Sequence, residues 1–534
     1  MTGSMTRRRL LGCTALTVAM GMTGAGRAFA RAAKAGKRKP NVLIIYADDL
    51  GYQDVSCYGG TAVPTPNIDR LAAQGLRFTR GHAPSATCTP SRYALLTGEY
   101  AWRKEGAHIL PGDAPALIPP GKPTIASMLK GAGYTTSVVG KWHLGLGSGD
   151  LDWNGRIAPG PLEIGFDYAY YFPATLDRVP SVFIEQHNVV NLDPADPIKV
   201  SYTDNISKDP TGAEHPELLR MTPNDGHDGT IVDGVSRIGF MSGGHSARWK
   251  DEDIADTLVA KASDWFEKVV GDQPFFMYFA ASEIHVPRVP AKRFQGTTGL
   301  GPRGDAIAEF DWVVGALVAK LDELGVLDDT MIILSSDNGP VLNDGYNDDA
   351  VQKVGEHRPS GPFRSGKYAI YDGGLMVPFI VRWPDAVPAG VESPALVDHV
   401  DIFATMAALT GQTLAHDAAV DSFDLLPAFI GATRSGREYV VEDTSTNIAE
   451  EDNLKKHSNS IFALVAGDWK VIKPLGQPSS FHGNEIGNGP VPALFNIAND
   501  PGETVDLAAR YPDRTRTMLA RLDTILDGSR TRPG

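Results

Sequence analysis

Two acidic pairs stand at the ends of short apolar runs in this 534-residue chain. Asp48-Asp49 follows the run 41–46, and Asp337-Asn338 follows a second run of the same kind. Burying like charges is costly unless a cation offsets them. Three carboxylates and one amide oxygen suit Ca²⁺ or Mg²⁺, whereas zinc prefers nitrogen and sulfur ligands. A single aspartate would more simply cap a turn, but the two pairs together favour a metal site.

One cysteine lies in a polar stretch just before a short apolar segment. Cys88 is followed four residues later by Arg92 and then by the run 93–98. If a helix begins near Cys88, this spacing places both side chains on one face of the helix. Cys57 is the other cysteine that remains if the N-terminal segment is removed. A Cys57–Cys88 disulfide is therefore the alternative interpretation.

Polar residues also follow other apolar runs. The run 135–139 is followed by Lys141 and His143, and the run 274–279 is followed by His285. Helical patterns alternate with these runs at residues 66–75, 125–131, 253–270 and 307–325. This alternation predicts an α/β fold, with a large, mainly parallel or mixed sheet flanked by helices on both faces. Ligands of such sheets bind beyond the carboxyl ends of the strands, so we expect the polar residues to share one site.

The last hundred residues follow a different pattern. Three short apolar runs and a final helical pattern lie at residues 461–465, 469–472, 493–496 and 510–526. We expect a smaller α+β subdomain with an antiparallel sheet over residues 435–534. Residues 41–434 would form the catalytic domain. Within it, the Pro-, Gly- and Asp-rich stretch from about 150 to 250 has the character of insertions that shape a pocket.

The N-terminal residues have the features of an export signal. Residues 6–11 resemble a twin-arginine signal, and Ala28-Phe29-Ala30 is a small-x-small cleavage site. We expect a signal peptide over residues 1–30, a linker over 31–40, and a periplasmic or secreted mature protein. No later apolar run is long enough to span a bilayer, so no stable membrane insertion is expected. The net charge of −14 argues against a nucleic-acid partner.

The order of these motifs resembles that of the sulfatase family. Cys-x-Pro-Ser-Arg from Cys88, followed by Leu-Leu-Thr-Gly, is similar to the family's cysteine signature. Segments similar to its metal segments, second signature, histidine–proline element and Gly-Lys loop lie at residues 41–51, 336–339, 140–145, 284–287 and 364–374. In the last of these, Ser365 stands where a glycine is more usual. The resemblance spans residues 41–435 and extends less specifically to the smaller C-terminal unit.

The resemblance implies a calcium-dependent sulfatase with an alkaline-phosphatase-like fold. Cys88 would be converted by a formylglycine-generating enzyme to formylglycine, an aldehyde whose hydrate attacks the sulfur of a sulfate ester. One Ca²⁺ would be held by Asp48, Asp49, Asp337, Asn338 and residue 88. The substrate class implied is a small-molecule or saccharide sulfate ester.

The resemblance also implies roles for the cationic and histidine residues. Arg92 and Lys141 would hold and polarise the hydrate, and His143 would be the base on its second hydroxyl. His285 and Lys367 would bind the sulfate group and assist the leaving oxygen. These roles make physical sense, because a metal and three cationic side chains offset the negative charge that makes sulfate esters poor electrophiles.

A carbohydrate sulfate is the substrate we expect, since polar and aromatic residues together suit a sugar. The insertion residues considered are Tyr168, Tyr170, Tyr171, Asp177, Arg178, His227, Arg237, His245, Arg248 and Trp249. The alternative is that the aromatic residues form the core of the insertions. Two other functions remain open: a phosphodiesterase or phosphonate monoester hydrolase with the same nucleophile, and a metal-stabilised binding protein without turnover.

Overall fold

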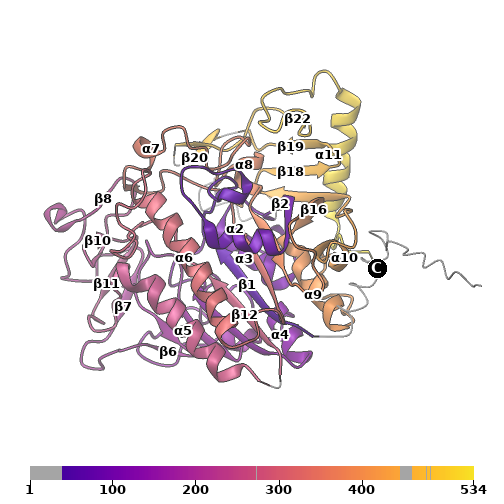
Figure 1. Cartoon of the computed structure of the whole chain (residues 1–534). Coiled ribbons are helices and arrows are strands. Elements are labelled where there is room, and N and C mark those ends of the chain that lie inside the picture. Colours follow the sequence, from indigo (N-terminus) through magenta and orange to yellow (C-terminus); the bar gives the residue numbers. More distant parts are fainter. Residues whose placement is uncertain (1–38, 272, 446–459, 477, 482, 534) are drawn as a thin grey trace, which may run out of the picture.

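The computed structural model describes residues 39–271, 273–445, 460–476, 478–481 and 483–533. The predicted signal peptide and nearly all of the predicted linker lie outside the described residues. The described part contains a large central sheet with helices around it and a smaller sheet beside it (Figure 1). Among the described helices, none combines the length and the apolar character that crossing a membrane requires.

Ten strands form the central sheet, and their directions are mixed. They are β1 (Asn41–Ala47), β2 (Leu76–His82), β3 (Thr135–Lys141), β4 (Tyr168–Phe172), β5 (Ile184–Glu185), β6 (Asn188–Val189), β12 (Phe275–Ala280), β13 (Thr330–Ser336), β15 (Phe379–Arg382) and β16 (Val391–Asp398). Their order is β16-β2-β15-β13-β1-β12-β3-β4-β5-β6. The five strands from β13 to β4 are parallel, whereas β15 is antiparallel to both of its neighbours. The sequence-based prediction of a mainly parallel or mixed sheet is confirmed.

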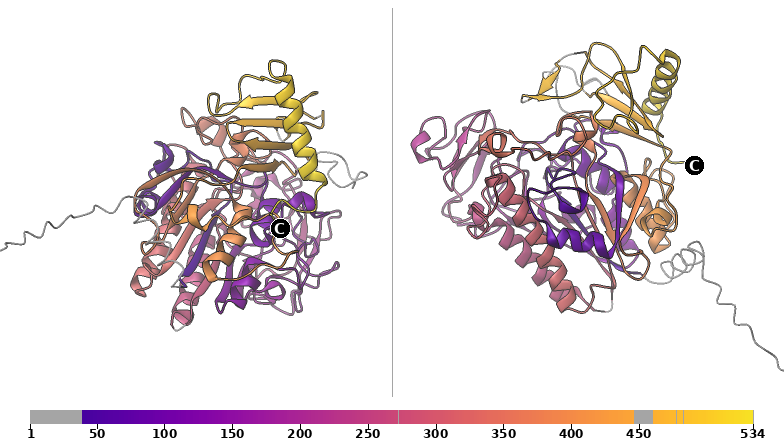
Figure 2. Two further views of the ribbon diagram at one scale, coloured as in Figure 1. Left: turned by 90° about the vertical axis from the view of Figure 1, so that its right-hand side faces the viewer. Right: turned by 45° about the horizontal axis from the view of Figure 1, so that its top comes forward.

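Helices cover both faces of this sheet (Figure 2). Successive strand residues point to opposite faces, so on β1 Ile44 joins one core and Ile45 joins the other. One face packs against α2 (Pro66–Gln74), α5 (Ile254–Val269) and α6 (Pro302–Glu323). The other packs against α3 (Cys88–Thr97), α4 (Ile125–Gly131), α9 (Ile402–Thr410) and α10 (Leu426–Phe429). The polar residues that follow β1, β3, β12 and β13 lie beyond the ends of these strands, outside the two apolar layers.

A second, antiparallel sheet lies near the C-terminus. Its strands are β17 (Tyr439–Asp443), β18 (Phe462–Ala466), β19 (Trp469–Lys473) and β22 (Ala493–Asn496), and α11 (Pro512–Asp527) packs on them. This confirms the predicted antiparallel sheet and closing helix. The Ala86 N–H donates to the Asp443 carbonyl at 2.9 Å, so β17 contacts the segment that precedes Cys88.

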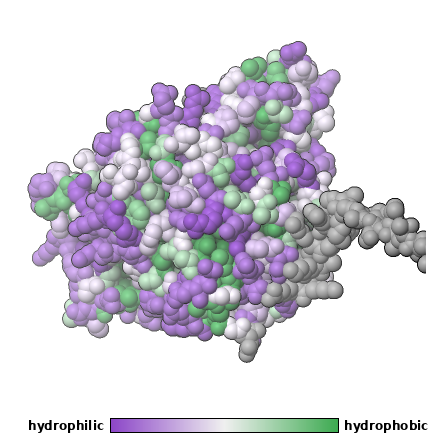
Figure 3. All heavy atoms as spheres, viewed as in Figure 1, coloured by the Kyte–Doolittle hydropathy of each residue, from purple (hydrophilic) through white to green (hydrophobic). Residues whose placement is uncertain are grey.

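The remaining elements are short. They are β7 (Lys199–Ser201), β8 (Thr222–Pro223), β9 (Ile231–Val232), β10 (Val235–Ser236), β11 (Phe240–Ser242), β14 (Tyr346–Asn347), α7 (Ala350–Lys353), α8 (Asp372–Leu375), β20 (Ser480–Phe481) and β21 (Asn484–Glu485). Most of the stretch 150–250 is irregular, but β4, β5 and β6 belong to the central sheet. Figure 3 shows a mainly hydrophilic face with hydrophobic residues in scattered groups.

The buried carboxyl group of Glu309 is expected to make stability depend on pH. Glu309 on α6 is 5% exposed, and burial together with nearby Glu283 raises its pKa to about 8. The folded chain keeps this proton between the unfolded pKa near 4.5 and pH 8, so stability falls as pH rises across that window. We expect Glu309→Gln to increase the unfolding free energy by about 1–3 kcal/mol at pH 8.5, with a smaller gain at pH 5.5.

Denaturant melts at the two pH values measure this effect. Glu323→Gln, an exposed substitution on the same helix, is the matched control and should change stability little at either pH. Equal pH dependence in the wild-type protein and the Glu309→Gln variant would contradict the prediction.

Candidate active site

The two acidic segments meet at one edge of the central sheet. β1 and β13 are parallel neighbours in register, so the segments that follow them lie side by side. The Asp49 N–H donates to Asp337 Oδ1 at 3.3 Å, and Asn338 Nδ2 donates to Asp49 Oδ1 at 2.7 Å. Asp48 is likewise buried here. The structure thus brings together the four side chains that we call the acidic cluster: Asp48, Asp49, Asp337 and Asn338.

The donor atoms of the acidic cluster fit a hard divalent cation. One ligand atom from each of Asp48, Asp49 and His285 lies within 4.8 Å of the other two. Asn338 Oδ1 is buried and has no hydrogen-bond partner among the described residues, although buried amide oxygens ordinarily have one. A buried oxygen without a donor, set among carboxylates, is the environment in which Ca²⁺ or Mg²⁺ binds.

Cys88 is the first residue of α3, as the predicted helix start requires. The first N–H groups of a helix have no partner within it, and they carry partial positive charge. The N-cap residue Thr87 makes no side-chain capping bond. Negative charge on a group at this end is therefore stabilised. Cys57 and Cys88 are both free, so the structure does not form the alternative disulfide.

Arg92 lies one turn after Cys88 and connects α3 to the acidic cluster. Its Nε and Nη2 donate to Asp337 Oδ2 at 3.0 and 2.7 Å, and Nη2 lies 3.7 Å from Asp48 Oδ1. Its Nη1 donates to the Tyr278 hydroxyl at 3.1 Å. Tyr278 escaped the sequence analysis because it lies inside the apolar run of β12. The guanidinium fixes the distance between residue 88 and both acidic segments.

Lys141 ends β3 and contacts the same cluster. Its Nζ donates to both carboxylate oxygens of Asp48 at 2.8 Å. Gly140, immediately before it, has a φ of +110°, and a Cβ there would lie 1.9 Å from the Ala280 carbonyl oxygen. Only glycine lets β3 run this close to β12, so the chain can deliver the lysine to the sheet edge.

His143 contacts residue 88 directly. Its Nδ1 lies 3.2 Å from Cys88 Sγ, and its Nε2 lies 2.9 Å from the Leu110 carbonyl oxygen. A carbonyl only accepts, so Nε2 carries the hydrogen and Nδ1 turns its lone pair toward residue 88. Burial, with the charges of Lys141 and Arg178, lowers the pKa of His143 well below its ordinary value. The neutral imidazole thus faces residue 88 as a proton acceptor.

Lys367 and His285 face the opposite side of Asp49. Lys367 Nζ donates to Asp49 Oδ2 and to Asp344 Oδ2, both at 2.9 Å. His285 Nε2 lies 3.9 Å from Asp49 Oδ2 and 4.0 Å from Asp344 Oδ2, and burial with the Lys367 charge lowers its pKa to about 4. Asp344 also accepts from the Tyr368 hydroxyl at 2.7 Å. The sequence analysis missed Asp344, because its Gly-, Asn- and Asp-rich surroundings are those of an ordinary turn.

The pKa values of two aspartates in the acidic cluster are shifted in opposite directions. Burial raises the pKa of Asp48 to about 8, although Lys141 opposes the shift. Burial would also raise the pKa of Asp337, but Arg92 and Lys141 outweigh it and hold that pKa below its ordinary value. Neighbouring buried carboxylates with such different proton affinities are typical of sites that bind a cation or a reacting group.

The backbone at this edge is strained at several non-glycine residues. Positive φ angles occur at Asp49 (64°), His143 (53°), Ile284 (83°), Ser365 (60°) and Tyr368 (74°). Asp49 and His143 carry site side chains, Ile284 and Tyr368 adjoin His285 and Lys367, and Ser365 lies two residues before Lys367. Such conformations cost about 1–3 kcal/mol each and persist where the surrounding structure enforces them, as at functional sites.

Three residues of the insertions lie beside the site. His227 Nε2 is 3.0 Å from Asp177 Oδ2, and Arg178 Nη1 is 3.1 Å from Asp177 Oδ1. The charge of Arg178 acts on His143, and the charge of His285 acts on Asp177. These contacts place the three residues near His143 and His285, and their role as pocket residues stays a prediction.

The other insertion candidates make contacts away from the acidic cluster. Tyr170, Tyr171 and Trp249 are buried in the core, and Arg237 pairs with buried Asp251. Tyr168 donates to Glu185, and His245 and Arg248 both contact Asp209. The alternative that the aromatic residues form the core therefore holds for Tyr170, Tyr171 and Trp249, because β4 belongs to the central sheet and Trp249 packs against Phe172 on it. For the other four residues, the sugar-pocket expectation stays a prediction.

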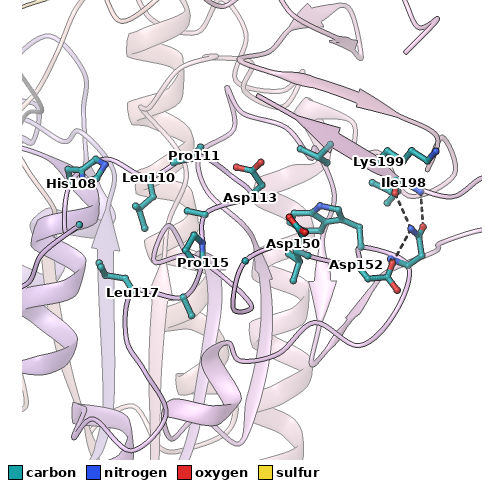
Figure 4. Close-up of a pocket in the computed structure, with 18 of the residues that line it drawn as sticks. His108, Leu110, Pro111, Asp113, Pro115, Leu117, Asp150, Asp152, Ile198 and Lys199 are labelled. Atoms are coloured by element: carbon teal, nitrogen blue, oxygen red, sulfur yellow. Dashed lines mark hydrogen bonds between the residues drawn. The ribbon is translucent and has the colours of Figure 1, made fainter. Parts of the chain in front are cut away.

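A cavity of about 990 Å³ is lined in part by the segment from His108 to Leu117 (Figure 4). Leu110, whose carbonyl holds the His143 ring, is in its wall together with Asp113. Asp152 and Lys199 lie across from them in Figure 4. The cavity thus shares a wall with the site and is lined by polar as well as apolar side chains.

Comparisons with known proteins agree with this geometry. A model of the sulfatase family matches residues 40–412. An N-acetylgalactosamine-6-O-sulfatase from Bacteroides thetaiotaomicron is 47% identical over 491 residues, covering 91% of this chain and 93% of that protein. Arylsulfatase A from Homo sapiens is 30% identical over 524 residues, covering 93% and 90%.

A solved structure gives the same result. It comes from work on the metabolism of multiple glycosaminoglycans by Bacteroides thetaiotaomicron, and it aligns with a TM-score of 0.87 at 46% identity. The alignment covers 92% of this chain and 100% of that chain. The match therefore includes the central sheet, the acidic edge and the smaller C-terminal sheet together. The chain belongs to the sulfatase family and hydrolyses sulfate esters.

Proposed function

We propose that this sulfatase removes the 6-O-sulfate of N-acetylgalactosamine, or of a glycan that carries it. The observation that carries the chemistry is the buried edge where Cys88, His143 and the acidic cluster converge. The choice of sugar follows the relative that is 47% identical over more than nine tenths of this chain. A phosphonate or phosphate diester hydrolase of the same fold is the second candidate, because the same nucleophile would serve it.

We assign Ca²⁺ to the acidic cluster, with residue 88 as a further ligand. The fit rests on the carboxylate and amide oxygens of the acidic cluster and on the Asn338 oxygen that has no partner among the described residues. Four aspartates face three cationic side chains at this edge. A bound divalent cation favours the ionised form of all four aspartates, Asp48 included. Together with a singly charged sulfate ester it would then bring the summed charge of these groups to zero. Mg²⁺ would satisfy the same charge balance, and metal analysis distinguishes the two.

In the proposed mechanism, Ca²⁺ supplies a fixed positive charge against the sulfate oxygens, and formylglycine at residue 88 supplies a hydroxyl that attacks sulfur. Arg92 and Lys141 stabilise the negative charge that develops beside residue 88. The attack would form a bond between this hydroxyl oxygen and sulfur and break the bond between sulfur and the alcohol oxygen. His143 Nδ1, which already faces residue 88, would then accept the proton of the second hydroxyl of the hydrate, so that sulfate leaves and the aldehyde re-forms. The Lys367 ammonium, with its raised pKa, and His285 face the sulfate oxygens and the leaving alcohol. Water and the ester yield an alcohol and sulfate.

The sugar itself would be held by the insertion residues beside the site. Asp177, Arg178 and His227 offer a carboxylate, a guanidinium and an imidazole in contact with one another. Groups of these kinds recognise sugar hydroxyls through hydrogen bonds. The 990 Å³ cavity that Leu110 and Asp113 line is large enough for further sugar units of a longer glycan.

Export and maturation complete the proposal. The twin-arginine motif and the cleavage site at Ala28-Phe29-Ala30 suit a periplasmic or secreted enzyme. A formylglycine-generating enzyme would act on Cys88 before folding, since Cys88 is 2% exposed in the folded chain. We further propose residues 41–434 as the catalytic domain and 435–534 as the C-terminal subdomain.

Mass spectrometry of the peptide that contains residue 88 tests the nucleophile. We expect most of the active protein to carry an aldehyde there, with a mass about 18 Da below that of the thiol. The peptide that contains Cys57 is the internal control and should keep its thiol. A fully active preparation with only a thiol at residue 88 would exclude this mechanism.

A substrate panel tests the sugar. We expect kcat/KM for N-acetylgalactosamine 6-sulfate to exceed that for the 4-sulfate by at least about 100-fold, because a misplaced ester cannot reach residue 88. The corresponding 6-phosphate and a phosphonate monoester are included under identical metal conditions. Faster hydrolysis of the phosphorus esters would support the second candidate.

A further inference from the structure

The loop that carries Lys367, residues 364–372, is held from two sides. On the catalytic side, the Lys367 N–H donates to the Pro340 carbonyl at 2.9 Å, and the Tyr368 N–H donates to the Ala86 carbonyl at 2.9 Å. These contacts place the loop beside the segments that carry Asn338 and Cys88. Lys367 therefore reaches the site only while the loop keeps this position.

The other side of the loop contacts the C-terminal part of the chain. The Ser365 hydroxyl donates to the Glu485 carbonyl at 2.6 Å, and the Ile370 N–H donates to the Ile486 carbonyl at 3.0 Å. The Arg364 guanidinium donates to the carboxylate of Glu485 at 3.0 and 2.6 Å. The C-terminal part of the chain thus holds the loop on the side opposite the catalytic residues.

A buried ionic cluster lies where the loop ends and α8 begins. Lys470 Nζ on β19 donates to Asp372 Oδ1 at 2.6 Å, and it lies 3.0 Å from Glu442 Oε2 and 3.3 Å from Glu503 Oε1. Glu503 Oε2 also accepts from the Asp372 N–H at 2.6 Å. His82 Nδ1 lies 2.7 Å from Glu442 Oε1. We call Lys470, Asp372, Glu442, Glu503 and His82 the Lys470 cluster.

Members of the Lys470 cluster are at most 2% exposed. Three carboxyl groups surround one lysine and one histidine, so removing the lysine would leave buried acids without their cation. Burial raises the pKa of Glu503 to about 8, which reduces the negative charge that Lys470 must offset at neutral pH. The proposed reaction uses none of these residues. They come from segments that are far apart in the sequence, so the cluster joins the central sheet to the C-terminal part of the chain.

The C-terminal end of the loop is also packed tightly on the acidic segment. The Gly339 N–H donates to the Gly374 carbonyl at 2.8 Å, and a Cβ on Gly339 would lie 1.9 Å from the Gly373 carbonyl oxygen. Asp372 directly precedes these glycines. The Gly373 N–H donates to the Arg364 carbonyl at 3.0 Å, so a shift of Asp372 moves backbone that touches both the loop and the residue after Asn338.

We propose that Lys470 is a positioning residue for the sulfatase reaction: through its ion pair with Asp372 it fixes the loop that aims Lys367 at the sulfate group. The proposal rests on the proposed role of Lys367 in sulfate binding. It gives the antiparallel C-terminal sheet a function in catalysis, although that sheet contributes no side chain to the acidic cluster.

Lys470→Met tests the proposal, because methionine keeps most of the side-chain volume and removes the charge. We expect kcat/KM to fall about 10- to 100-fold, the range of loss for a catalytic group displaced by about 1 Å. The inhibition constant of inorganic sulfate, which occupies the same site, should rise by a similar factor. Lys473→Met is the matched control on the same strand, since Lys473 is exposed and pairs with Asp523, and it should change neither value.

A double-mutant cycle separates positioning from general damage. Lys367→Met alone should lower kcat/KM and weaken sulfate inhibition, and adding Lys470→Met should cause little further loss. Additive losses would overturn the positioning role of Lys470. No effect of Lys367→Met would instead contradict the proposed role of Lys367, so the two failures are distinguishable.

A second variant guards against loss of folding. Lys470→Met combined with Glu442→Gln removes one positive and one negative charge, so the cluster stays balanced. We expect this variant to fold, as judged by circular dichroism and thermal melting, and still to show the weakened sulfate inhibition. A folded, charge-balanced variant with wild-type kcat/KM and wild-type sulfate inhibition would overturn the proposal.

Discussion

Cys88→Ala is expected to lower sulfate ester hydrolysis by about 10⁴-fold or more, because residue 88 carries the proposed attacking oxygen and, among the described residues, only its side chain is hydrogen-bonded to His143 Nδ1. The loss should appear in kcat rather than in binding of inorganic sulfate. The cationic side chains and the N-terminus of α3 remain in place in this variant. Steady-state kinetics and sulfate inhibition measure the two quantities separately.

The same substitution should leave the fold nearly intact. Cys88 is buried at the first position of α3, and alanine removes one sulfur atom and no hydrogen bond within the helix. We expect a loss of stability of about 1 kcal/mol. Cys57→Ala is the matched control, because Cys57 is free, half-buried and remote from His143 in the described contacts. Substantial turnover by Cys88→Ala, or equal loss in Cys57→Ala, would refute the role of residue 88.

Asp337→Asn should have the second largest effect, since Asp337 contacts both Arg92 on α3 and the segment that carries Asp49. Its Oδ2 accepts two hydrogen bonds from Arg92, and its Oδ1 accepts the Asp49 N–H. Removing its charge weakens metal binding and leaves Arg92 without its closest anion. We expect a loss of about 10³-fold in kcat/KM and about 3–5 kcal/mol in stability.

Calorimetric titration with Ca²⁺ and Mg²⁺ measures the metal part of this prediction. Thermal melts with and without a chelator measure the part that folding shares with metal binding. In the wild-type protein Ca²⁺ should raise the melting temperature, and in Asp337→Asn this rise should shrink. Asp322→Asn, an exposed substitution on α6, should bind metal normally. Unchanged metal affinity and rate in Asp337→Asn would require a different ligand set.

Hydrophobic patterning was enough to predict the central strands and their chemistry. The run ending at Asp48 and the run ending at Asp337 are buried on both sides, so their sequences are almost wholly apolar and their ends are sharply polar. Parallel strands place such ends at one edge, and this makes the acidic cluster predictable from the sequence alone. The sulfatase family was predicted on a different basis, namely the resemblance of the motifs and of their order to those of that family.

Edge and irregular strands were not predictable in this way. β2 contains Arg77, Arg80 and Gly81, and β16 contains Pro394 with a change of register between Ser393 and Leu396. Their apolar residues alternate with polar ones or are interrupted, so the local pattern indicates loops. Only pairing with β15 and with each other stabilises them as strands. β4 was assigned to an insertion for a similar reason, although it extends the parallel part of the sheet.

The sequence by itself was enough to nominate the candidate site residues, because a strand end, a helix start and a glycine-rich turn are local features, and the resemblance to the sulfatase family supplied their expected roles. Tertiary structure alone decided which residues, distant in the sequence, pair with these charged side chains. Asp344 contacts Lys367, Tyr278 contacts Arg92, and Lys470 contacts Asp372. Such pairs depend on how separate elements pack in three dimensions, and the cost of burying an unpaired charge appears only once that packing is known.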